Sequence, residues 1–369
     1  MFALKQFLKM ILQHMILPLV YDFWRIVYFG KEKHLIIFAD AHHETMPYSM
    51  QKVYEELKRR GCDVLEEIHD DKKVSQLTSF LMAVRFMRVY AQAKVVFICD
   101  NFFPVVSCRK SKKTKVVQLW HSCGLLKKMG YDTGEDIPKY YIGNVYKNYD
   151  LVTVSAPAVE APLTSAMHQK PGVVRALGVS RTDTYFDQEW IQKCRRQFYE
   201  TYPEAEGKKV VLWAPTFRGN AGNPYQEGTE AVLRLEKELG EQYFVIRKVH
   251  PYVEAREHLS NCVIPTEQLL PVTDLMITDY SSVLFDYLFF KRPYVLFAPD
   301  LETYLEKRGF YVEYDSLSPY VVTEGEQLKE TVQKAMESRE QSWIQEQYDL
   351  HISACDGQVT ERILKWLGF

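Results

Sequence analysis

The chain has 369 residues, which is enough for two domains of ordinary size. Apolar residues make up 47% of the chain and charged residues 25%, a composition typical of globular proteins. The net charge of −2 provides no general basic field, which argues against nucleic acid as the main partner.

The first 30 residues are predicted to form an amphipathic helical segment. Apolar residues recur at helical spacing on one face, at Leu4, Phe7, Leu8, Ile11, Leu12 and Met15. The opposite face carries Lys5, Lys9 and Gln13. No uninterrupted apolar run of about 20 residues occurs, so a transmembrane helix is not expected, and no small-residue cleavage site marks a secretory signal. The lysine and aromatic content favours a helix in the plane of a membrane interface; the alternative is a helix packed on the surface of its own domain.

From residue 31 the chain alternates between predicted strands and helices. The strands are expected at residues 34–40, 64–68, 95–100, 115–121, 151–155 and 173–178, with helices at 48–60 and 74–93. Short apolar runs joined by helices are typical of a parallel sheet that is covered on both faces. Residues 31–185 are therefore predicted to form one Rossmann-like domain.

A second alternation predicts a second Rossmann-like domain over residues 186–369. Its strands are expected at residues 209–216, 243–250, 274–280 and 293–298. Residues 181–207 are polar and helical and are interpreted as the connection between the domains. Residues 326–367 are mostly helical, with Asp356 placed to cap the last helix. Two doubly wound α/β domains whose strand ends face each other would enclose a central cleft, where ligands of this fold class bind.

Residues 274–290 are the most distinctive stretch of the chain. Residues 275–277 indicate a buried strand, a hydroxyl-rich turn follows, and residues 283–290 are apolar nearly all round, which indicates a buried helix. Ser281 or Ser282 is well suited to cap that helix. Because free N–H groups and the positive end of the helix dipole would face the strand end, the turn is a candidate anion site. The alternative is a capped core helix without a ligand.

His121 stands at the end of the strand predicted over residues 115–121, before a turn that contains a glycine. A histidine in that place can be held within reach of a substrate hydroxyl. Imidazole groups titrate near neutral pH, which suits a general base. We predict this role, against the alternative that the ring caps the following helix or bonds to the backbone.

Three further strand ends carry polar groups. Thr216 and Arg218 follow one strand and offer a hydroxyl and a cationic fork suited to phosphate oxygens; a surface arginine is the alternative for Arg218. Lys248 and His250 share one side of the next strand, where His250 could donate to a diphosphate. Asp279 opens the hydroxyl-rich turn. Together these groups suit a nucleotide diphosphate in one domain and an activated hydroxyl in the other.

Motifs of several other protein classes are absent from the sequence. No Walker pattern GxxxxGK[ST] occurs and no GxGxxG follows the first strand, which disfavours a kinase or a dehydrogenase. The seven cysteines are scattered without a CxxC pair, which supports neither a zinc site nor a disulfide framework and favours a reducing, cytosolic compartment. No DxD-type metal pair stands out. We therefore predict no cofactor and no metal, with the charge of a leaving diphosphate balanced by side chains and the helix dipole.

Residues 109–115 hold five cations in seven positions. Such a run is usually a solvated loop. Together with the amphipathic N-terminal segment it could instead contact anionic lipid headgroups, so an anionic membrane surface is a predicted partner.

Four motifs resemble the CDP-glycerol glycerophosphotransferase family of teichoic acid synthesis: QLWHSCGLLKKMG (118–130), VLWAPTFRG (211–219), RKVHP (247–251) and TDLMITDYSSVLFDYLFFKRPYVLF (273–297). The resemblance covers roughly residues 30–320 in the same order, and the first motif is most similar to the glycerol-phosphate primase branch. It implies a GT-B fold of two Rossmann-like domains, the first binding the acceptor and the second binding CDP-glycerol. It also implies a peripheral location on the cytoplasmic face of the bacterial cell membrane.

The resemblance further implies a transfer of glycerol phosphate from CDP-glycerol to a hydroxyl of an undecaprenyl-diphosphate-linked disaccharide, ManNAc-GlcNAc, with release of CMP. It assigns His121 as the general base on that hydroxyl and His250 to the donor diphosphate. Further phosphate contacts are assigned to Thr216, Arg218, Ser281 and Ser282. Asp279 would orient a neighbouring donor or contact the glycerol. The alternatives are a glycerol- or ribitol-phosphate polymerase, a GT-B glycosyltransferase that uses a nucleotide sugar, and a non-catalytic scaffold docked to the membrane.

Overall fold

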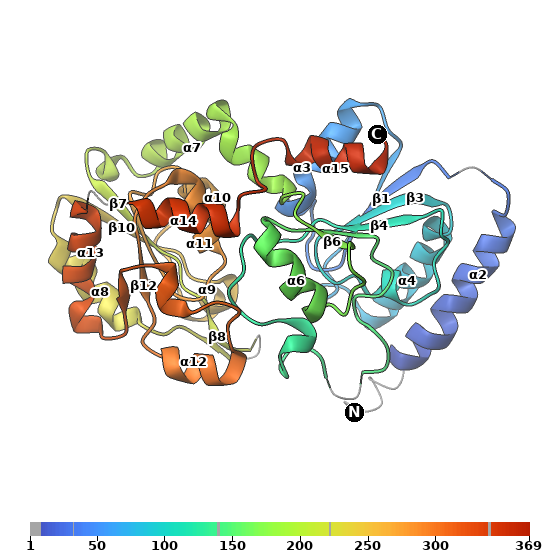
Figure 1. Cartoon of the computed structure of the whole chain (residues 1–369), viewed down its shortest axis with the longest axis horizontal. Helices are drawn as coiled ribbons and strands as arrows, with labels where there is room; N and C mark the ends of the chain where they lie inside the picture. The colour runs from blue at the N-terminus through green and yellow to red at the C-terminus, as the bar shows by residue number, and fades with distance from the viewer. Residues whose placement is uncertain (1–8, 32, 139–140, 221–222, 339–340) are drawn as a thin grey trace. The chain divides into compact units, whose positions relative to one another are not determined.

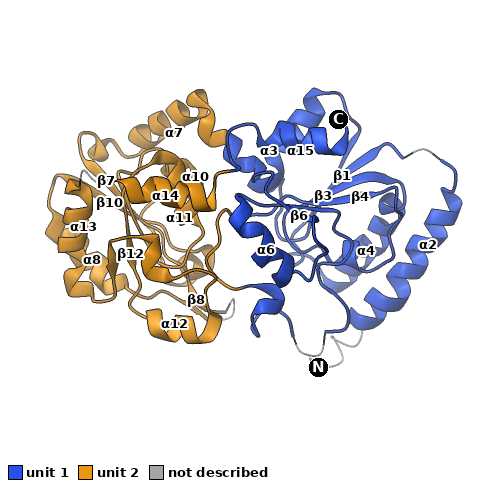
Figure 2. Ribbon diagram, viewed as in Figure 1, with its two compact units in different colours: residues 1–121, 129–183, 354–369 blue, residues 122–128, 184–353 orange. Residues whose placement is uncertain are grey.

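The computed structural model describes residues 9–369 apart from positions 32, 139–140, 221–222 and 339–340 (Figure 1). The chain forms two compact units that are discontinuous in sequence (Figure 2). Unit 1 contains residues 1–121, 129–183 and 354–369, and unit 2 contains residues 122–128 and 184–353. The predicted boundary near residue 185 divides the chain once. In the structure, residues 122–128 also belong to unit 2, and residues 354–369 belong to unit 1.

Unit 1 is built on a six-stranded parallel sheet with the order β2-β1-β3-β4-β5-β6. Its strands are β1 (Leu35–Asp40), β2 (Val64–Ile68), β3 (Ala93–Ile98), β4 (Lys115–Gln118), β5 (Leu151–Thr153) and β6 (Val174–Arg175). All six lie where the sequence predicts strands. The central strand β1 is continuously apolar before Asp40 because both of its faces are buried: Ile36, Ile37 and Phe38 are at most 2% exposed.

The helices of unit 1 are α2 (Leu17–Val27), α3 (Tyr48–Arg59), α4 (Gln76–Tyr90), α5 (Phe103–Val106), α6 (Pro157–Ala166) and α15 (Val359–Leu367). Helix α4 begins where the Ser75 hydroxyl accepts a hydrogen bond from the Thr78 N–H at 3.1 Å. Helix α2 lies alongside α4 (Figure 1), and its inner side carries Leu17 and Tyr21, which are fully buried. The N-terminal helix is therefore part of the packing of unit 1.

The faces of the N-terminal segment differ from the predicted ones. The predicted face residues Leu4, Lys5, Phe7 and Leu8 lie outside the described residues. Leu12–Ile16 form a π-helical turn before α2, and this wider turn rotates the helix surface relative to a regular α-helix. As a result Gln13, predicted on the polar face, is buried and donates to the Tyr141 hydroxyl. Met15, predicted on the apolar face, is 59% exposed. Across the described part of the chain, no helix is long and apolar enough to cross a membrane.

The last helix, α15, packs in unit 1 and is capped differently from the prediction. The carboxylate of Asp183 accepts hydrogen bonds from the N–H groups of Val359 and Thr360 at 3.0 and 2.8 Å. Asp356, the predicted cap, instead accepts from the N–H of Gln358, one residue before the helix begins. Asp183 is the last residue of unit 1 before the chain enters unit 2. Its two bonds therefore attach the C-terminal helix to the end of the preceding segment of the same unit.

Unit 2 contains a five-stranded parallel sheet with the order β10-β7-β11-β12-β13 and a separate antiparallel hairpin. The sheet strands are β7 (Lys209–Trp213), β10 (Tyr243–Arg247), β11 (Leu275–Thr278), β12 (Tyr294–Phe297) and β13 (Val321–Val322), and the hairpin strands are β8 (Arg218–Asn220) and β9 (Asn223–Tyr225). The helices are α7 (Gln188–Thr201), α8 (Thr229–Leu239), α9 (Pro251–Glu257), α10 (Thr266–Leu269), α11 (Val283–Tyr287), α12 (Leu301–Arg308), α13 (Leu328–Glu337) and α14 (Ser342–His351). Helices α8 and α13 bury Leu235 and Val332 in one cluster with Val211 and Ile277 of the sheet.

Both parallel sheets follow the same doubly wound order. The chain reverses its direction across the sheet between β1 and β3 in unit 1 and between β7 and β11 in unit 2. This order differs from the 3-2-1-4-5-6 order of dinucleotide-binding Rossmann domains, but it belongs to the same doubly wound class. In open sheets of this class, ligands bind beyond the carboxyl ends of the strands at the point of reversal. The carboxyl ends of these two strand pairs are therefore the places in each unit where a ligand is expected.

Candidate active site

His121 lies in unit 1, three residues beyond the end of β4 at Gln118. The strand ends earlier than predicted because the backbone turns at Trp120, whose φ of 33° lies in the left-handed region. A bulky residue rarely adopts this conformation, and residues held in such strained conformations cluster at functional sites. Beyond the turn, the His121 side chain is exposed.

A hydrogen bond fixes the tautomer of the His121 ring. Its Nδ1 atom lies 2.9 Å from the carbonyl oxygen of Cys99, just after β3. A carbonyl oxygen can only accept a hydrogen bond, so Nδ1 carries the proton, and in the neutral ring Nε2 then holds a lone pair. This is the tautomer that a general base requires. The bond to the backbone does not compete with a catalytic role, because it orients the ring for that role.

The chain leaves unit 1 immediately after His121, and residues 122–128 belong to unit 2. Within unit 2 this segment lies against α11: a Cβ atom added to Gly124 would be 2.2 Å from Cγ of Phe285. Gly124 also has a φ of 68°, which glycine adopts without strain. At the end of the segment the Lys128 N–H donates to the Gly309 oxygen at 3.0 Å. The glycine of the predicted turn is therefore required by packing in unit 2.

Three of the predicted residues meet at the carboxyl ends of β7 and β11, where the strand order of unit 2 reverses. The Thr216 N–H donates to Oδ1 of Asp279 at 2.7 Å, and Nη2 of Arg218 donates to Oδ2 of Asp279 at 3.0 Å. The Tyr280 N–H donates to the same Oδ1 at 2.6 Å. Asp279 is 2% exposed. A buried carboxylate that accepts three hydrogen bonds suits the predicted role of orienting neighbouring hydrogen-bond donors better than the role of a glycerol contact.

Arg218 does not have the open position that the predicted phosphate contact needs. Its side chain is 6% exposed, and besides Asp279 it binds Asp300 through Nε–Oδ2 and Nη2–Oδ1 distances of 2.7 and 2.8 Å. The rings of Tyr280 and Tyr304 lie 4.9 and 5.1 Å from its Cζ atom. Arg218 therefore joins the loops that follow β7, β11 and β12. The phosphate contact of this residue stays a prediction.

The charges of this cluster reinforce one another. Burial works against the charged guanidinium, but the hydrogen bonds and charges of Asp300 and Asp279 outweigh it and raise the pKa of Arg218. Burial also opposes ionisation of Asp300, yet the hydrogen bonds and charge of Arg218 lower the pKa of Asp300. Arg218 and Asp300 are therefore both charged at neutral pH. Sequence reasoning missed Asp300, although its position just beyond the end of β12 is the same signal that identified Asp279.

Thr216 is the better candidate for a ligand contact in the loop after β7. Its backbone oxygen accepts from Nη1 of Arg218 at 2.5 Å and from Gln226 at 3.1 Å. Its hydroxyl oxygen is buried and has no hydrogen-bond partner among the described residues. A buried hydroxyl without a partner destabilises the folded state by roughly 1–3 kcal/mol. A phosphate oxygen of a bound ligand would remove that penalty.

The end of β10 adds Lys248 and His250. His250 caps α9, with its Nδ1 atom accepting from the Tyr252 N–H at 3.2 Å. In the neutral ring the proton is therefore on Nε2, which can donate to an anion. The His250 ring lies 4.4 Å from the ring of Phe217, beside the loop after β7. The Lys248 ammonium donates to the Cys262 oxygen at 3.0 Å, a bond that needs one of its three N–H donors.

The turn after β11 is a weaker anion site than the sequence predicts. Helix α11 has five residues and continues as a single 3-10 turn over Leu288–Phe290, so few peptide dipoles are aligned behind its N-terminus. Ser282 occupies the N-cap position, but within the described structure its side chain makes no capping bond. The Ser281 hydroxyl lies 3.4 Å from the Val283 nitrogen, which is a long hydrogen bond. The half-buried hydroxyls of the two serines, and not the helix dipole, are the groups that could meet a phosphate.

Helix α11 packs against a buried histidine at the end of α14. His351 is 1% exposed, and its ring lies 4.6 Å from that of Phe285. Burial lowers the pKa of His351 from 6.5 to about 4. The unfolded chain therefore binds a proton more readily than the folded chain, and stability is lost as the pH falls from about 6.5 towards 4.

We expect His351 alone to lower the free energy of unfolding of unit 2 by about 2.5 kcal/mol between about pH 7 and pH 4.5. Urea denaturation of the wild type and of His351→Phe at both pH values measures this loss of stability. Between the two pH values, the variant should lose about 2.5 kcal/mol less than the wild type. His258→Asn replaces an exposed histidine of the same unit and should behave like the wild type. An equal loss in His351→Phe and the wild type would contradict a buried, neutral ring.

Seven of the eight candidate residues belong to unit 2, beyond the neighbouring strands β10, β7 and β11. They are Thr216, Arg218, Lys248, His250, Asp279, Ser281 and Ser282. His121 belongs to unit 1. In the ranges that the structure describes, no group of three or more histidine, cysteine, aspartate or glutamate side chains is arranged to hold a metal ion. Unit 1 thus offers a base, and unit 2 offers hydroxyl, ammonium and imidazole donors for an anionic ligand.

The sequence is similar to that of proteins with known activities. The profile of the CDP-glycerol:poly(glycerophosphate) glycerophosphotransferase family matches residues 20–367. The chain is 30% identical over 359 residues to a teichoic acid ribitol-phosphate primase of Bacillus spizizenii, which covers 90% of each chain. It is 31% identical over 243 residues to a teichoic acid glycerol-phosphate primase of Bacillus subtilis, which covers 61% of each chain.

The structure is similar to that of the wall teichoic acid polymerase TagF, with a TM-score of 0.71 and 20% sequence identity. The match covers 99% of this chain and 97% of that one. At this identity the likeness concerns the fold, and it confirms the predicted α/β architecture with parallel sheets. The central cleft and the membrane-associating N-terminal segment stay predictions.

Proposed function

The chain belongs to the CDP-glycerol:poly(glycerophosphate) glycerophosphotransferase family, and we propose that it primes teichoic acid synthesis. It moves glycerol phosphate from CDP-glycerol to a hydroxyl of the undecaprenyl-diphosphate-linked disaccharide ManNAc-GlcNAc and releases CMP. The observation that carries this proposal is the orientation of His121. Its Nδ1 atom is held by the Cys99 oxygen, so the basic Nε2 atom of the exposed ring is available to a hydroxyl.

The proposed reaction is a direct displacement at phosphorus. Nε2 of His121 accepts the proton of the acceptor hydroxyl while the hydroxyl oxygen bonds to the β-phosphorus of CDP-glycerol. The bond between the β-phosphorus and the oxygen that bridges the two phosphates breaks, and CMP leaves with that oxygen and its electron pair. His121 returns its proton to solvent after the products leave.

Unit 2 is proposed to hold the donor. The Nε2–H group of His250, the Lys248 ammonium and the Thr216 hydroxyl all follow the neighbouring strands β10 and β7 and can donate to the diphosphate. Such fixed donors stabilise the negative charge that builds up on the leaving CMP. Arg218 supports this site indirectly, because it holds Asp279 and the loop of Thr216 in place.

Transfer of ribitol phosphate is a second candidate function. It is favoured by one observation: a relative that is 30% identical and matches 90% of both chains is a ribitol-phosphate primase. The displacement at phosphorus would be the same, and only the alcohol attached to the β-phosphate would differ.

Product mass tests these candidates. The protein is incubated with the lipid-linked disaccharide and one donor at a time: CDP-glycerol, CDP-ribitol or a UDP-sugar. We expect a single glycerol phosphate to be added from CDP-glycerol. Addition of ribitol phosphate alone would select the second candidate, and addition of many units would identify a polymerase. Transfer from a UDP-sugar would identify a glycosyltransferase, and no product and no calorimetric binding with any donor would indicate a scaffold.

The outward face of α2 is proposed to meet the membrane that carries the acceptor. Between 58% and 87% of the surface of five large apolar side chains is exposed in and around this helix. They are Met15, Leu19, Phe23, Ile26 and Phe29. Apolar side chains on a soluble surface usually occur singly, so a stripe of five favours contact with an apolar phase.

Cations gather beside this helix. The Ser111 N–H in the basic run donates to the Tyr21 hydroxyl of α2 at 2.9 Å, and the Lys33 ammonium donates to the Thr114 hydroxyl at 2.9 Å. Burial, followed by the positive charges of Lys113, Arg25 and Lys110, lowers the pKa of Lys33 to about 8. A local excess of positive charge beside the helix that carries the apolar stripe suits the headgroups of an anionic bilayer.

The double variant Phe23→Asp/Ile26→Asp should bind phosphatidylglycerol-containing vesicles at least about tenfold more weakly than the wild type, because each side chain loses roughly 1.5–3 kcal/mol of apolar transfer. Vesicle cosedimentation measures the change. Leu305→Asp alters an exposed leucine of unit 2 and should bind like the wild type. Unchanged binding of the double variant would assign membrane contact to another surface. Point substitutions are preferable to removal of residues 1–29, which would also take Leu17 and Tyr21 from the core.

A further inference from the structure

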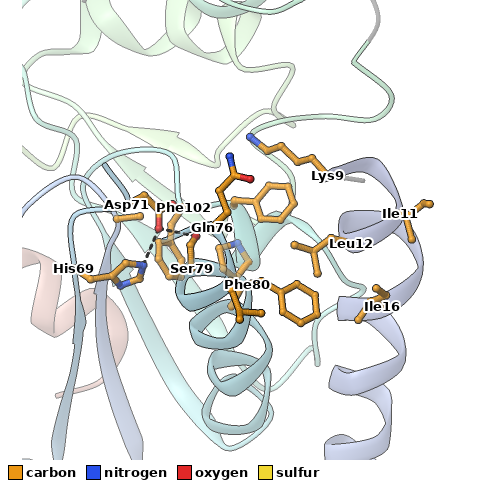
Figure 3. Close-up of a pocket in the computed structure, with 15 residues that line it drawn as sticks. Lys9, Ile11, Leu12, Ile16, His69, Asp71, Gln76, Ser79, Phe80 and Phe102 are labelled. Atoms are coloured by element: carbon orange, nitrogen blue, oxygen red, sulfur yellow. Dashed lines mark hydrogen bonds and ion pairs between the residues drawn. The ribbon is translucent and has the colours of Figure 1, made fainter. Parts of the chain in front are cut away.

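Unit 1 contains a cavity of about 640 Å³ that the proposed reaction has not used (Figure 3). Ala41, His69 and Phe102 line it, and these residues follow β1, β2 and β3 respectively. The cavity therefore lies beyond the carboxyl ends of the strands on both sides of the reversal in strand order, where sheets of this class bind ligands. Its volume falls within the roughly 300–1,000 Å³ of small-molecule sites.

The walls of the cavity are apolar. Leu12 of the π-helical turn and Phe80 of α4 point towards one another across it, and Phe102 closes the inner side (Figure 3). On the opposite wall, Oδ1 of Asp71 accepts from the Ser79 hydroxyl at 2.8 Å and lies 3.2 Å from Nε2 of His69. Nδ1 of His69 is a buried polar atom without a hydrogen-bond partner among the described residues. A guest in this space would mainly contact hydrocarbon, so the cavity favours an apolar chain over a polar ligand.

The positively charged side chain of Lys9 lies at the rim of the cavity. Lys9 lines it, and its ammonium lies 5.0 Å from the centre of the Phe103 ring (Figure 3). The Lys9 side chain is otherwise exposed. An anionic group attached to the end of an apolar guest would therefore find a positive charge where it leaves the cavity.

The cavity and His121 lie at the same edge of one sheet. Strand β4, which precedes His121, is the next neighbour of β3 and lies two strand positions from β1. With a strand spacing of about 4.8 Å, the loop after β1 and the loop after β4 are about 10 Å apart across the sheet. Cys99 and Phe102 belong to the same loop, and Cys99 holds the His121 ring. If the phosphates of a ligand lie at the cavity rim, sugars attached to them can therefore reach His121.

We propose that this cavity binds the phosphate-proximal end of the polyprenyl chain of the acceptor, with the diphosphate beside Lys9 and the sugars directed towards His121. The inference rests on the proposed function, because it gives a place to the lipid part of that acceptor. Ile16 lines the cavity and directly precedes α2, whose exposed apolar stripe is assigned to the membrane. The lining of the cavity and the helix that carries the apolar stripe are thus adjacent along the chain.

The direct test is calorimetric binding of farnesyl diphosphate, a soluble polyprenyl diphosphate, to the full-length protein. Ala83 on α4 lines the cavity and is 9% exposed, so Ala83→Phe fills the space. We expect this variant to bind farnesyl diphosphate at least about tenfold more weakly than the wild type. Leu81→Phe adds a ring on the same helix at a site that is 55% exposed and outside the cavity, and it should keep the wild-type affinity.

Two results would overturn the inference: equal affinity of Ala83→Phe and the wild type, or inorganic diphosphate binding as tightly as farnesyl diphosphate. If Ala83→Phe has a lowered melting temperature, Ser79→Trp at the half-buried rim takes its place in the comparison. The mass of the transfer product is measured on the same wild-type sample. Farnesyl diphosphate binding without transfer would count against the proposed function, whereas transfer without farnesyl diphosphate binding would count against the cavity.

Discussion

Exchanging His121 for asparagine is expected to slow the transfer of glycerol phosphate about 1,000-fold. The asparagine amide can still donate to the Cys99 oxygen that holds the wild-type ring. It has no basic atom to accept the proton of the acceptor hydroxyl. Release of CMP at saturating donor and acceptor gives kcat directly. Affinity for CDP-glycerol should change by less than about twofold, because the proposed donor contacts all lie in unit 2.

His168 provides the matched control for this variant. It is an exposed histidine of unit 1 whose ring lies 3.8 Å from that of Tyr131. His168→Asn should keep the wild-type kcat. A His121→Asn enzyme with a kcat within about tenfold of the wild type would remove His121 from its role as the base.

Replacing Arg218 with methionine should lower the free energy of unfolding of unit 2 by about 3–5 kcal/mol, because it leaves two carboxylates without their counter-charge. Asp279 is 2% exposed and the Asp300 side chain is 22% exposed. Methionine keeps an apolar stem against Tyr280, so most of the loss comes from the ion pairs. Urea denaturation at neutral pH measures the difference.

The pH dependence of the same variant separates lost ion pairs from lost packing. Burial opposes ionisation of Asp300, but Arg218 lowers the pKa of Asp300 from 3.8. The ion pair therefore stabilises the wild type at pH values above the pKa of Asp300 in the unfolded chain. This contribution is lost as the pH falls through the lower pKa of Asp300 in the folded chain. Arg218→Met should lose less stability on acidification than the wild type. A variant of wild-type stability that bound CDP-glycerol at least about tenfold more weakly would support the predicted phosphate contact.

The strands could be predicted because each is a short apolar run that is buried on both faces, as Ile36 to Phe38 and Leu275 to Ile277 show. The strand order could not be predicted. It depends on pairings such as Val211 with Leu275, between segments that are separated by three helices and three other strands. Composition and periodicity carry no information about such long-range pairings, so the shared order of the two sheets appears only in the structure.

The roles of the charged residues depended on partners far away in the sequence. Arg218 has the local pattern of a phosphate ligand, but Asp300, 82 residues later, gives it a structural role. Asp356 lies close to the last helix, but the residue that caps the helix is Asp183, 176 residues before Val359. Sequence position placed these residues close to the ends of strands and helices, but it could not show which of their side chains were already paired.

The two histidines were visible in the sequence because both stand just beyond apolar strands. Their tautomers were not visible, because each is set by a backbone group from another position. Nδ1 of His121 donates to the Cys99 oxygen, whereas Nδ1 of His250 accepts from the Tyr252 N–H. In the neutral rings, Nε2 is consequently an acceptor in His121 and a donor in His250. The same side chain is thus prepared for a base in unit 1 and for an anion contact in unit 2.

Calorimetric titration of CDP-glycerol into His121→Asn and His250→Asn tests this division of roles most directly. Asparagine is a good N-cap, so the second variant keeps the start of α9 while it removes the Nε2 donor. We predict wild-type donor affinity for His121→Asn and at least about tenfold weaker binding for His250→Asn. Loss of donor affinity in His121→Asn together with wild-type affinity in His250→Asn would contradict the account.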